Sequence, residues 1–237
     1  MAGDGSSIKC WFSGVCPDAN STKCDRCVDR GIHYLANVLF IPKAQIPKAY
    51  QFIEIADMAL APEQLPIASY LDNVKKLVDE GKGFYSHGQG SGTGKTTFGC
   101  IALRRYLYYS LREKPADTEN RRVLYLNTSE FLDRIRKSFD REDLELEKLM
   151  EELTSIELAP KLILFDDIGA ERTNEWVQER LYNLLNFRSA NGLANIFSSN
   201  YSPEELVPRL GNRIYDRIMG CSKPVKFSGK SHRRCEW

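Results

Sequence analysis

The spacing of apolar residues alternates between two periods along the chain. Short apolar runs predict strands at residues 83–87, 122–127, 161–167, 195–200 and 224–227. Between these runs, apolar residues recur every three or four positions and predict helices at residues 67–80, 96–113, 129–140, 143–153, 175–192, 202–210 and 212–219. Because strands and helices alternate, we predict the α/β fold class, with a parallel sheet flanked by helices.

Three regions differ in composition. Residues 1–34 are rich in Cys, Gly and Asp, and they have too few apolar residues to build a core of their own. Residues 35–64 carry several prolines, which predict a linker with short turns. Residues 65–237 hold the regular pattern and are expected to form the α/β domain.

A glycine-rich segment, GQGSGTGKTT at residues 88–97, follows the first predicted strand and opens a helix. Glycine adopts the dihedral angles that turn successive N–H groups into one concavity, and the helix N-terminus favours an anion. In such a P-loop, Lys95 is expected to contact the β- and γ-phosphates of ATP, and the Thr96 hydroxyl to bind Mg²⁺. The residues predicted to surround the nucleotide are Gly90, Ser91, Gly92, Thr93, Gly94, Lys95, Thr96 and Thr97.

One position departs from the usual GxxxxGK[ST] spacing of a P-loop. Gln89 stands where the first glycine is expected, between Gly88 and Gly90. We therefore expect the entry to the loop to bend differently. The alternative is a flexible glycine-rich turn without a ligand, but the flanking strand, the following helix and the ending GKTT argue against it.

Two carboxylates end the apolar run KLILFDD at residues 161–167, which has the composition of a strand buried on both faces. Asp166 is expected to hold Mg²⁺, and Asp167 to orient or deprotonate the attacking water. The next strand ends in Asn200, whose amide is expected to face the γ-phosphate and this water. The alternatives are aspartates that only start a turn and an Asx turn before Pro203.

Four of the seven cysteines lie close together near the N-terminus. Their spacing is C-x5-C-x7-C-x2-C, and the second pair fits one tetrahedral Zn²⁺ ion. Structural zinc would supply the folding free energy that a segment so poor in apolar residues lacks. The predicted ligands are Cys10, Cys16, Cys24 and Cys27, with His33 as a substitute. The alternative is that these cysteines hold no metal.

Bulk composition limits the class of protein. Of 237 residues, 42% are hydrophobic and 27% charged, and the formal net charge is +1, as in a soluble globular protein. DNA binding would therefore need a local patch, for which the Lys- and Arg-rich stretch 209–234 is a candidate. No apolar run approaches the ~20 residues of a membrane helix, and no export signal accompanies the odd number of cysteines. We expect a cytoplasmic protein without a membrane partner.

Three downstream segments resemble one known family. They are DDIGAERTNEWVQERLYNLLNFR from Asp166, NIFSSNYSPEEL from Asn195 and RLGNRIYDRIMG from Arg209. Over residues 65–235 the chain resembles the DnaC/DnaI-type helicase loaders and the related IstB transposition ATPases of the AAA+ class. Versions of this layout with N-terminal cysteines resemble phage or prophage loaders.

The resemblance implies a role for several residues. Lys95 and Thr96 match the Walker A motif, Asp166 and Asp167 the Walker B motif, and Asn200 the sensor 1 position. Arg217 matches the arginine finger that reaches the γ-phosphate of a neighbouring subunit, with Arg213 as the competing candidate, and Arg233 matches the sensor 2 arginine. The alternative for Arg213 and Arg217 is a surface helix held by salt bridges.

The resemblance also implies a DNA contact. Phe139 and Trp176 fall where the family presents aromatic side chains that stack on single-stranded DNA. Arg134, Arg136 and Lys137 lie close to Phe139 in sequence and are candidates for tracking the DNA backbone. The alternative is that both aromatic residues are buried in the core.

The function that this resemblance implies is ATP-dependent loading of a DnaB-type replicative helicase onto single-stranded DNA during DNA replication. The zinc module at residues 1–34 would bind the helicase, and subunits would assemble into a ring or spiral in the bacterial or phage-infected cytoplasm. One alternative is an IstB-like transposition ATPase that binds duplex DNA, against which the cysteine module argues. The other is a binding module whose ATPase has decayed, against which the intact P-loop and acidic pair argue.

Overall fold

Five parallel strands form the centre of the protein in a computed structural model that describes residues 40–55, 60–113, 120–139, 142–170 and 174–228. The strand order is β2-β3-β4-β1-β5. The strands are β1 (Gly83–His87), β2 (Val123–Asn127), β3 (Leu162–Asp166), β4 (Ala194–Ser199) and β5 (Ser222–Lys226). All neighbouring pairs are parallel, as predicted.

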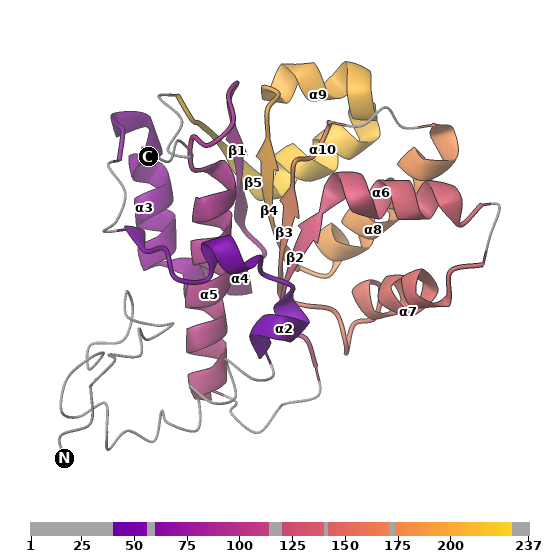
Figure 1. Ribbon diagram of the computed structural model, residues 1–237, viewed down its shortest axis with the longest axis horizontal. Helices are drawn as coiled ribbons and strands as arrows, with labels where there is room; N and C mark the ends of the chain where they lie inside the picture. The colour runs from indigo at the N-terminus through magenta and orange to yellow at the C-terminus, as the bar shows by residue number, and fades with distance from the viewer. Residues whose placement is uncertain (1–39, 56–59, 114–119, 140–141, 171–173, 229–237) are drawn as a thin grey trace, which may run out of the picture.

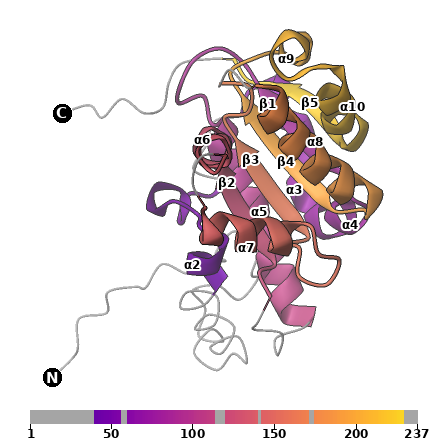
Figure 2. The ribbon, with the colours of Figure 1, turned by 90° about the vertical axis from the view of Figure 1, so that its right-hand side faces the viewer.

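Helices cover both faces of the sheet, as Figures 1 and 2 show. One face carries α3 (Leu65–Asp72), α4 (Val74–Asp79) and α5 (Lys95–Glu113). The other carries α6 (Thr128–Lys137), α7 (Leu144–Leu153), α8 (Glu175–Ala190), α9 (Pro203–Leu210) and α10 (Asn212–Cys221). Helix α2 (Ile41–Ala44) and the 3₁₀ turns η3 (Lys48–Tyr50) and η5 (Pro62–Gln64) precede α3. None of the helices in the described part of the chain has the length and apolar character that spanning a bilayer requires.

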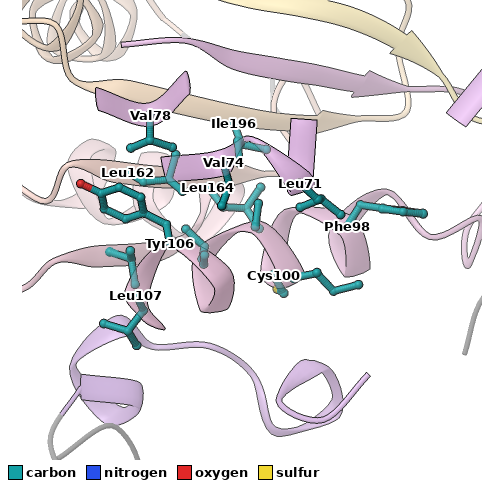
Figure 3. Packing of buried hydrophobic residues seen from close by; sticks show 14 of the residues in the cluster. Leu71, Val74, Val78, Phe98, Cys100, Tyr106, Leu107, Leu162, Leu164 and Ile196 are labelled. Carbon is teal, nitrogen blue, oxygen red and sulfur yellow. The ribbon is translucent and has the colours of Figure 1, made fainter. Parts of the chain in front are cut away.

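Successive residues of each central strand point to opposite faces, so one strand serves two cores. In β3, Leu162 and Leu164 pack with α3, α4 and α5, whereas Ile163 and Phe165 pack with the helices of the other face. Figure 3 shows the first of these cores, in which Leu164 lies among side chains from the helices. A strand buried on both faces must be apolar throughout, which is the pattern of the KLILF run.

Helix α5 lies close against β3. A Cβ atom on Gly99 would come within 2.7 Å of the Leu164 side chain, so glycine lets the helix approach the sheet. The close approach brings the first turn of α5 to the carboxyl end of the strands, where Thr96 meets Asp166.

Several boundaries differ from the sequence prediction by one to three residues, and three of the differences have a local structural reason. The predicted helix at residues 67–80 is broken into α3 and α4 at Asn73, whose side chain donates to the Ser69 carbonyl. Helix α6 begins at Thr128, one residue early, because the Asn127 side chain caps it by accepting from the Glu130 N–H. Strand β5 starts at Ser222, two residues early, and Pro224 is tolerated because β5 is an edge strand.

Part of the stretch predicted as a linker packs against the α/β body. Phe40, Ile41, Ala44 and Ile46 are buried in the core that α5 shares. The buried Arg104 of α5 donates to the backbone carbonyls of Gln51 and Ile53 and forms an ion pair with Glu54 at 2.9 Å. A buried arginine needs such partners, because an unpaired charge there would be strongly destabilising.

Candidate nucleotide-binding site

The predicted phosphate loop joins β1 to α5 at the carboxyl end of the sheet. Gly88, Gly90, Gly92 and Gly94 all have positive φ angles, between 78° and 148°. Only glycine adopts this backbone at low cost, and the resulting curl precedes the free N–H groups of the first turn of α5. The loop therefore has the backbone shape that binds a phosphate.

Lys95 holds the loop in shape from within. Its side chain is only 8% exposed. Its ammonium group donates to the carbonyls of Gly88 and Gly90, each at 2.9 Å, and lies 3.3 Å from the Thr93 hydroxyl. An ammonium group can donate three hydrogen bonds. The loop oxygens accept hydrogen bonds that the ammonium group would donate to the phosphate oxygens when an anion is bound. The geometry fits the predicted role of Lys95 in phosphate binding.

The unusual glycine spacing has a structural reason. Gly88 must be glycine because a Cβ there would lie 2.0 Å from the carbonyl oxygen of Phe227, just after β5. The Phe227 N–H also donates to the His87 carbonyl at 2.6 Å, which fixes this close approach. Gln89 is not among the residues with positive φ, so the usual first position does not require glycine here. The bend is displaced by one residue, and the later glycines keep their places.

Asp166, at the end of β3, receives three hydrogen bonds from three other elements. Its Oδ1 accepts from the Thr96 hydroxyl of α5 at 2.8 Å and from the Ser198 hydroxyl of β4. Its Oδ2 accepts from the Tyr125 hydroxyl of β2 at 2.8 Å. The carboxylate is 9% exposed, so its position and orientation are fixed by these donors.

Asp167 and Asn200 also lie together, as the sequence predicts. Asp167 is exposed and has a φ of 62°, a backbone that aspartate and asparagine tolerate better than other side chains. The Asn200 amide donates to Asp167 Oδ1 at 3.1 Å. Its side chain thus contacts the acidic pair and does not form the alternative Asx turn. The exposed carboxylate beside an amide is suited to hold a water molecule.

These groups are suited to Mg²⁺. The Thr96 hydroxyl and the Asp166 carboxylate present oxygen atoms 2.8 Å apart at the helix N-terminus that would hold the phosphates. Oxygen donors are what this hard cation prefers, and it commonly uses one or two carboxylates together with phosphate oxygens. Thr96 and Asp166 are therefore the residues that would hold the ion.

Tyr125 and Ser198 are site residues that the sequence analysis did not identify. Both lie on strands that flank β3, and their importance follows from the strand order, which apolar spacing does not give. Burial, and then the charge of Asp166, raise the pKa of the Tyr125 phenol, so it acts as a hydrogen-bond donor. The only sequence signal was their position near the carboxyl ends of their strands.

Replacing Tyr125 with phenylalanine is expected to weaken the Mg²⁺ dependence of nucleotide binding. The change removes one hydrogen bond to a charged group, typically about 1.5–3 kcal/mol, so the Mg²⁺ concentration at half-maximal binding should rise about tenfold or more. The measurement is a Mg²⁺ titration with a fluorescent ATP analogue. Tyr109→Phe, on the same side of the sheet but without this hydrogen bond, is the matched control. An unchanged titration of Tyr125→Phe would contradict the prediction.

Comparison with known proteins shows which family the chain belongs to. The family described as the bacterial DnaA ATPase domain matches residues 85–221, more than half of the chain. The chain belongs to this family. It is also similar to the replicative helicase loader DnaI of Bacillus subtilis (strain 168), with 26% identity over 216 residues. That match covers 84% of this chain and 62% of DnaI, so the chain spans less than two thirds of that relative.

Solved structures share the fold of this DnaA-type ATPase domain. The crystal structure of the DnaC helicase loader matches with a TM-score of 0.60 and 21% identity, covering 77% of this chain and all of that one. A replication initiator DnaA bound to AMPPCP and single-stranded DNA matches with a TM-score of 0.59 and 16% identity, covering 78% and 51%. The predicted resemblance to helicase loaders and the AAA+ type of parallel sheet are thus confirmed.

The two candidate finger arginines of the DnaA-type domain lie on α10, packed against α8. The guanidinium carbon of Arg213 lies 3.8 Å from the centre of the Tyr182 ring, and that of Arg217 lies 5.9 Å from it. Within the described ranges, both arginines therefore contact an aromatic ring and form no ion pair of the kind that the alternative of a salt-bridged helix requires. Whether either reaches a neighbouring subunit stays a prediction.

The aromatic pair proposed for DNA lies on the helical face opposite α5. Phe139 is 72% exposed and contacts Trp176 edge-on, with ring centres 5.6 Å apart. The alternative that Phe139 is a core residue is therefore wrong. Trp176 is partly buried and packs against the core. The Arg180 guanidinium covers the Trp176 ring at 5.2 Å. The pair offers one exposed aromatic surface beside a cation.

The basic residues before Phe139 have acidic partners. Arg134 donates to both carboxylate oxygens of Asp143, at 2.9 Å and 3.1 Å. Arg136 and Lys137 both pair with Asp133. Asp143 offsets the charge of Arg134, whereas Arg136 and Lys137 share Asp133, so part of the positive charge suggested for the DNA backbone is neutralised within the protein.

Several predicted residues lie outside the described residues. They are the zinc candidates Cys10, Cys16, Cys24, Cys27 and His33, and the sensor 2 candidate Arg233. Across the parts of the chain that the structure does describe, no group of three or more His, Cys, Asp and Glu side chains is arranged to hold a metal. Zinc binding by the N-terminal cysteines stays a prediction.

Proposed function

We propose that the chain hydrolyses ATP to ADP and phosphate. The observation that carries this proposal is the convergence of Lys95, Thr96 and Asp166 at the carboxyl end of the sheet, beside Asp167 and Asn200. Lys95 and the N–H groups of the loop bind the β- and γ-phosphates. Mg²⁺ held by Thr96 and Asp166 would neutralise charge that develops on the phosphate oxygens.

The hydrolytic step requires a water molecule in line with the γ-phosphate. Asp167 orients this water or accepts its proton, and Asn200 holds the Asp167 carboxylate through their 3.1 Å hydrogen bond. In an assembly of subunits, Arg217 of one subunit stabilises the γ-phosphate of the next, with Arg213 as its competitor, and Arg233 contacts the nucleotide in its own subunit. Such an arginine typically contributes about 10³–10⁵ in rate.

The cellular role that the similarity supports best is loading of a DnaB-type replicative helicase onto single-stranded DNA. The matched DnaI and DnaC proteins are named as helicase loaders, and the match to DnaI covers most of this chain. Residues 1–34, with zinc on the four cysteines, would bind the helicase. The ATPase domain would grip the DNA strand in the cytoplasm of a bacterium or of a phage-infected host.

A reconstituted loading reaction tests this role. The full chain, ATP and the host's replicative helicase are mixed with circular single-stranded DNA that is coated by a single-strand binding protein. The expected result is helicase retained on the circles only when the chain and ATP are present, and zinc in the purified protein that is lost in Cys24→Ser. Equal helicase retention without the chain would reject the loader role. Preferential binding of duplex DNA together with a transposase would favour the IstB-like alternative.

Replacing Phe139 with alanine is expected to weaken binding of single-stranded DNA. Stacking of a base on an aromatic ring is worth about 1–3 kcal/mol, so the dissociation constant should rise about fivefold to a hundredfold. The measurement is fluorescence anisotropy of a labelled oligonucleotide at fixed salt. Ile156→Ala is the control because Ile156 is also exposed, at 73%, but has no aromatic ring. Equal affinities of the two variants would remove Phe139 from the DNA site.

A further inference from the structure

Two arginines of α10 converge on one tyrosine of α8. Arg213 and Arg217 are four residues apart, so they lie on the same face of their helix. The ring of Tyr182 is the point where they meet, at 3.8 Å from Arg213 and 5.9 Å from Arg217. Both distances fall within the range of a cation–π contact.

The environment of Tyr182 differs from that of a buried core tyrosine. The positive charges of Arg213, and then of Arg217, lower the pKa of the Tyr182 phenol, in agreement with their contacts to its ring. The Nε atom of Arg217 is shielded from solvent and has no hydrogen-bond partner among the described residues. The Tyr182 ring is therefore a contact on the neighbouring helix that can orient the Arg217 side chain.

The joint between α9 and α10 is also held by α8. The Gln178 side chain, one turn before Tyr182, donates to the Arg209 carbonyl at 3.4 Å, and Gly211 follows with a φ of 82°. The helix that carries both arginines is thus fixed at its start by the same face of α8 that carries Tyr182. Stacking uses the flat face of a guanidinium and leaves the N–H groups at its edge for oxygen acceptors.

We propose that Tyr182 is a positioning residue that holds Arg213 and Arg217 together as one phosphate-binding pair. The inference rests on the proposed function, in which an arginine of one subunit completes the ATP site of the next. It adds that the two arginines are not competitors: Tyr182 orients both, and an oxyanion of the neighbouring γ-phosphate is met by a pair of guanidinium edges.

Removing the ring tests the proposal. In Tyr182→Leu the arginines lose their common contact, so the hydrolysis rate at protein concentrations that support assembly should fall about tenfold to a hundredfold, as for other misplaced catalytic groups. Nucleotide affinity of the isolated subunit and the melting temperature should stay unchanged. Tyr182→Phe keeps the ring and should retain most of the activity. Asn183→Ala, the adjacent exposed position on α8, is the control.

A mixing experiment separates positioning from a merely structural role. Asp167→Asn subunits keep the arginines but lack the residue that orients water, whereas Tyr182→Leu subunits keep their own ATP site. Mixed in equal amounts, the two inactive variants should recover hydrolysis, because an intact arginine pair then faces an intact site. Failure to recover, or unaltered hydrolysis by Tyr182→Leu alone, overturns the inference.

Single arginine variants separate the positioning role of Tyr182 from the arginine finger on which it depends. If Arg213→Ala and Arg217→Ala both slow assembly-dependent hydrolysis and Tyr182→Leu does so too, the pair is supported. If either arginine variant is slow but Tyr182→Leu is not, only the inference is wrong. If neither arginine variant is slow, the arginine finger of the proposed function is wrong as well.

Discussion

Asparagine at position 167 is expected to stop most hydrolysis while ATP stays bound. The substitution keeps the size of the side chain but removes the carboxylate that orients the water, and loss of such a group typically costs about 10²–10⁴ in rate. Asparagine also tolerates the positive φ of 62° at this position, so the backbone should not change. The measurement is single-turnover hydrolysis together with the dissociation constant for ATP.

The control for Asp167→Asn is Asp72→Asn. Asp72 is an exposed aspartate of α3 that pairs with Arg105 of α5 and is not part of the candidate site. It should hydrolyse ATP at the unaltered rate. If Asp167→Asn instead loses ATP binding and hydrolysis in equal measure, Asp167 belongs to the binding site and another group orients the water.

Lys95→Ala is expected to weaken ATP binding strongly. Lys95 is the charged side chain inside the loop, and removing one partner of a buried charge pair costs about 2–5 kcal/mol, a loss of affinity of about thirtyfold or more. The loop should also lose its shape, because the carbonyls of Gly88 and Gly90 lose their donor. Calorimetric titration with ATP and Mg²⁺ provides the measurement.

Lys148→Ala is the matched control, since Lys148 is an exposed lysine on α7. Its ATP affinity should equal that of the unaltered chain. Binding by Lys95→Ala that matches this control would show that the triphosphate does not occupy the loop, and the proposed ATPase activity would have no structural basis.

Much of this site follows from sequence because its parts are contiguous. The loop at residues 88–97 is one segment, and the aspartates directly follow a recognisable strand, so position along the chain is enough to predict them. Strand β1 spans Gly83–His87 as predicted, and the structure places Asn200 beside Asp167. Strands β3 and β4 end at the same edge of a parallel sheet, so Asp167 and Asn200 come together although they are far apart in sequence.

Other parts of the site depend on strand order, which a periodic pattern does not specify. Tyr125 and Ser198 reach Asp166 because β2 and β4 flank β3, and nothing local in the sequence of either strand reports this. Helix α6 starts one residue earlier than predicted because Asn127, the last residue of β2, is a good capping residue. The acidic partner of Arg134 is likewise not evident from α6 alone, since Asp143 is the N-cap residue of α7, and the role of the α6 cations in DNA binding stays a prediction.

The hydrogen bonds and the ion pair of Arg104 connect the chain near Ile53 to helix α5. Lys95 and Arg104 lie on one unbroken helix, about 13 Å apart at 1.5 Å per residue. Residues 51–54, which follow the cysteine-rich region in sequence, are therefore bound to α5, the helix that begins at the phosphate loop. A displacement of this segment would therefore act on the same helix whose first turn completes the phosphate loop.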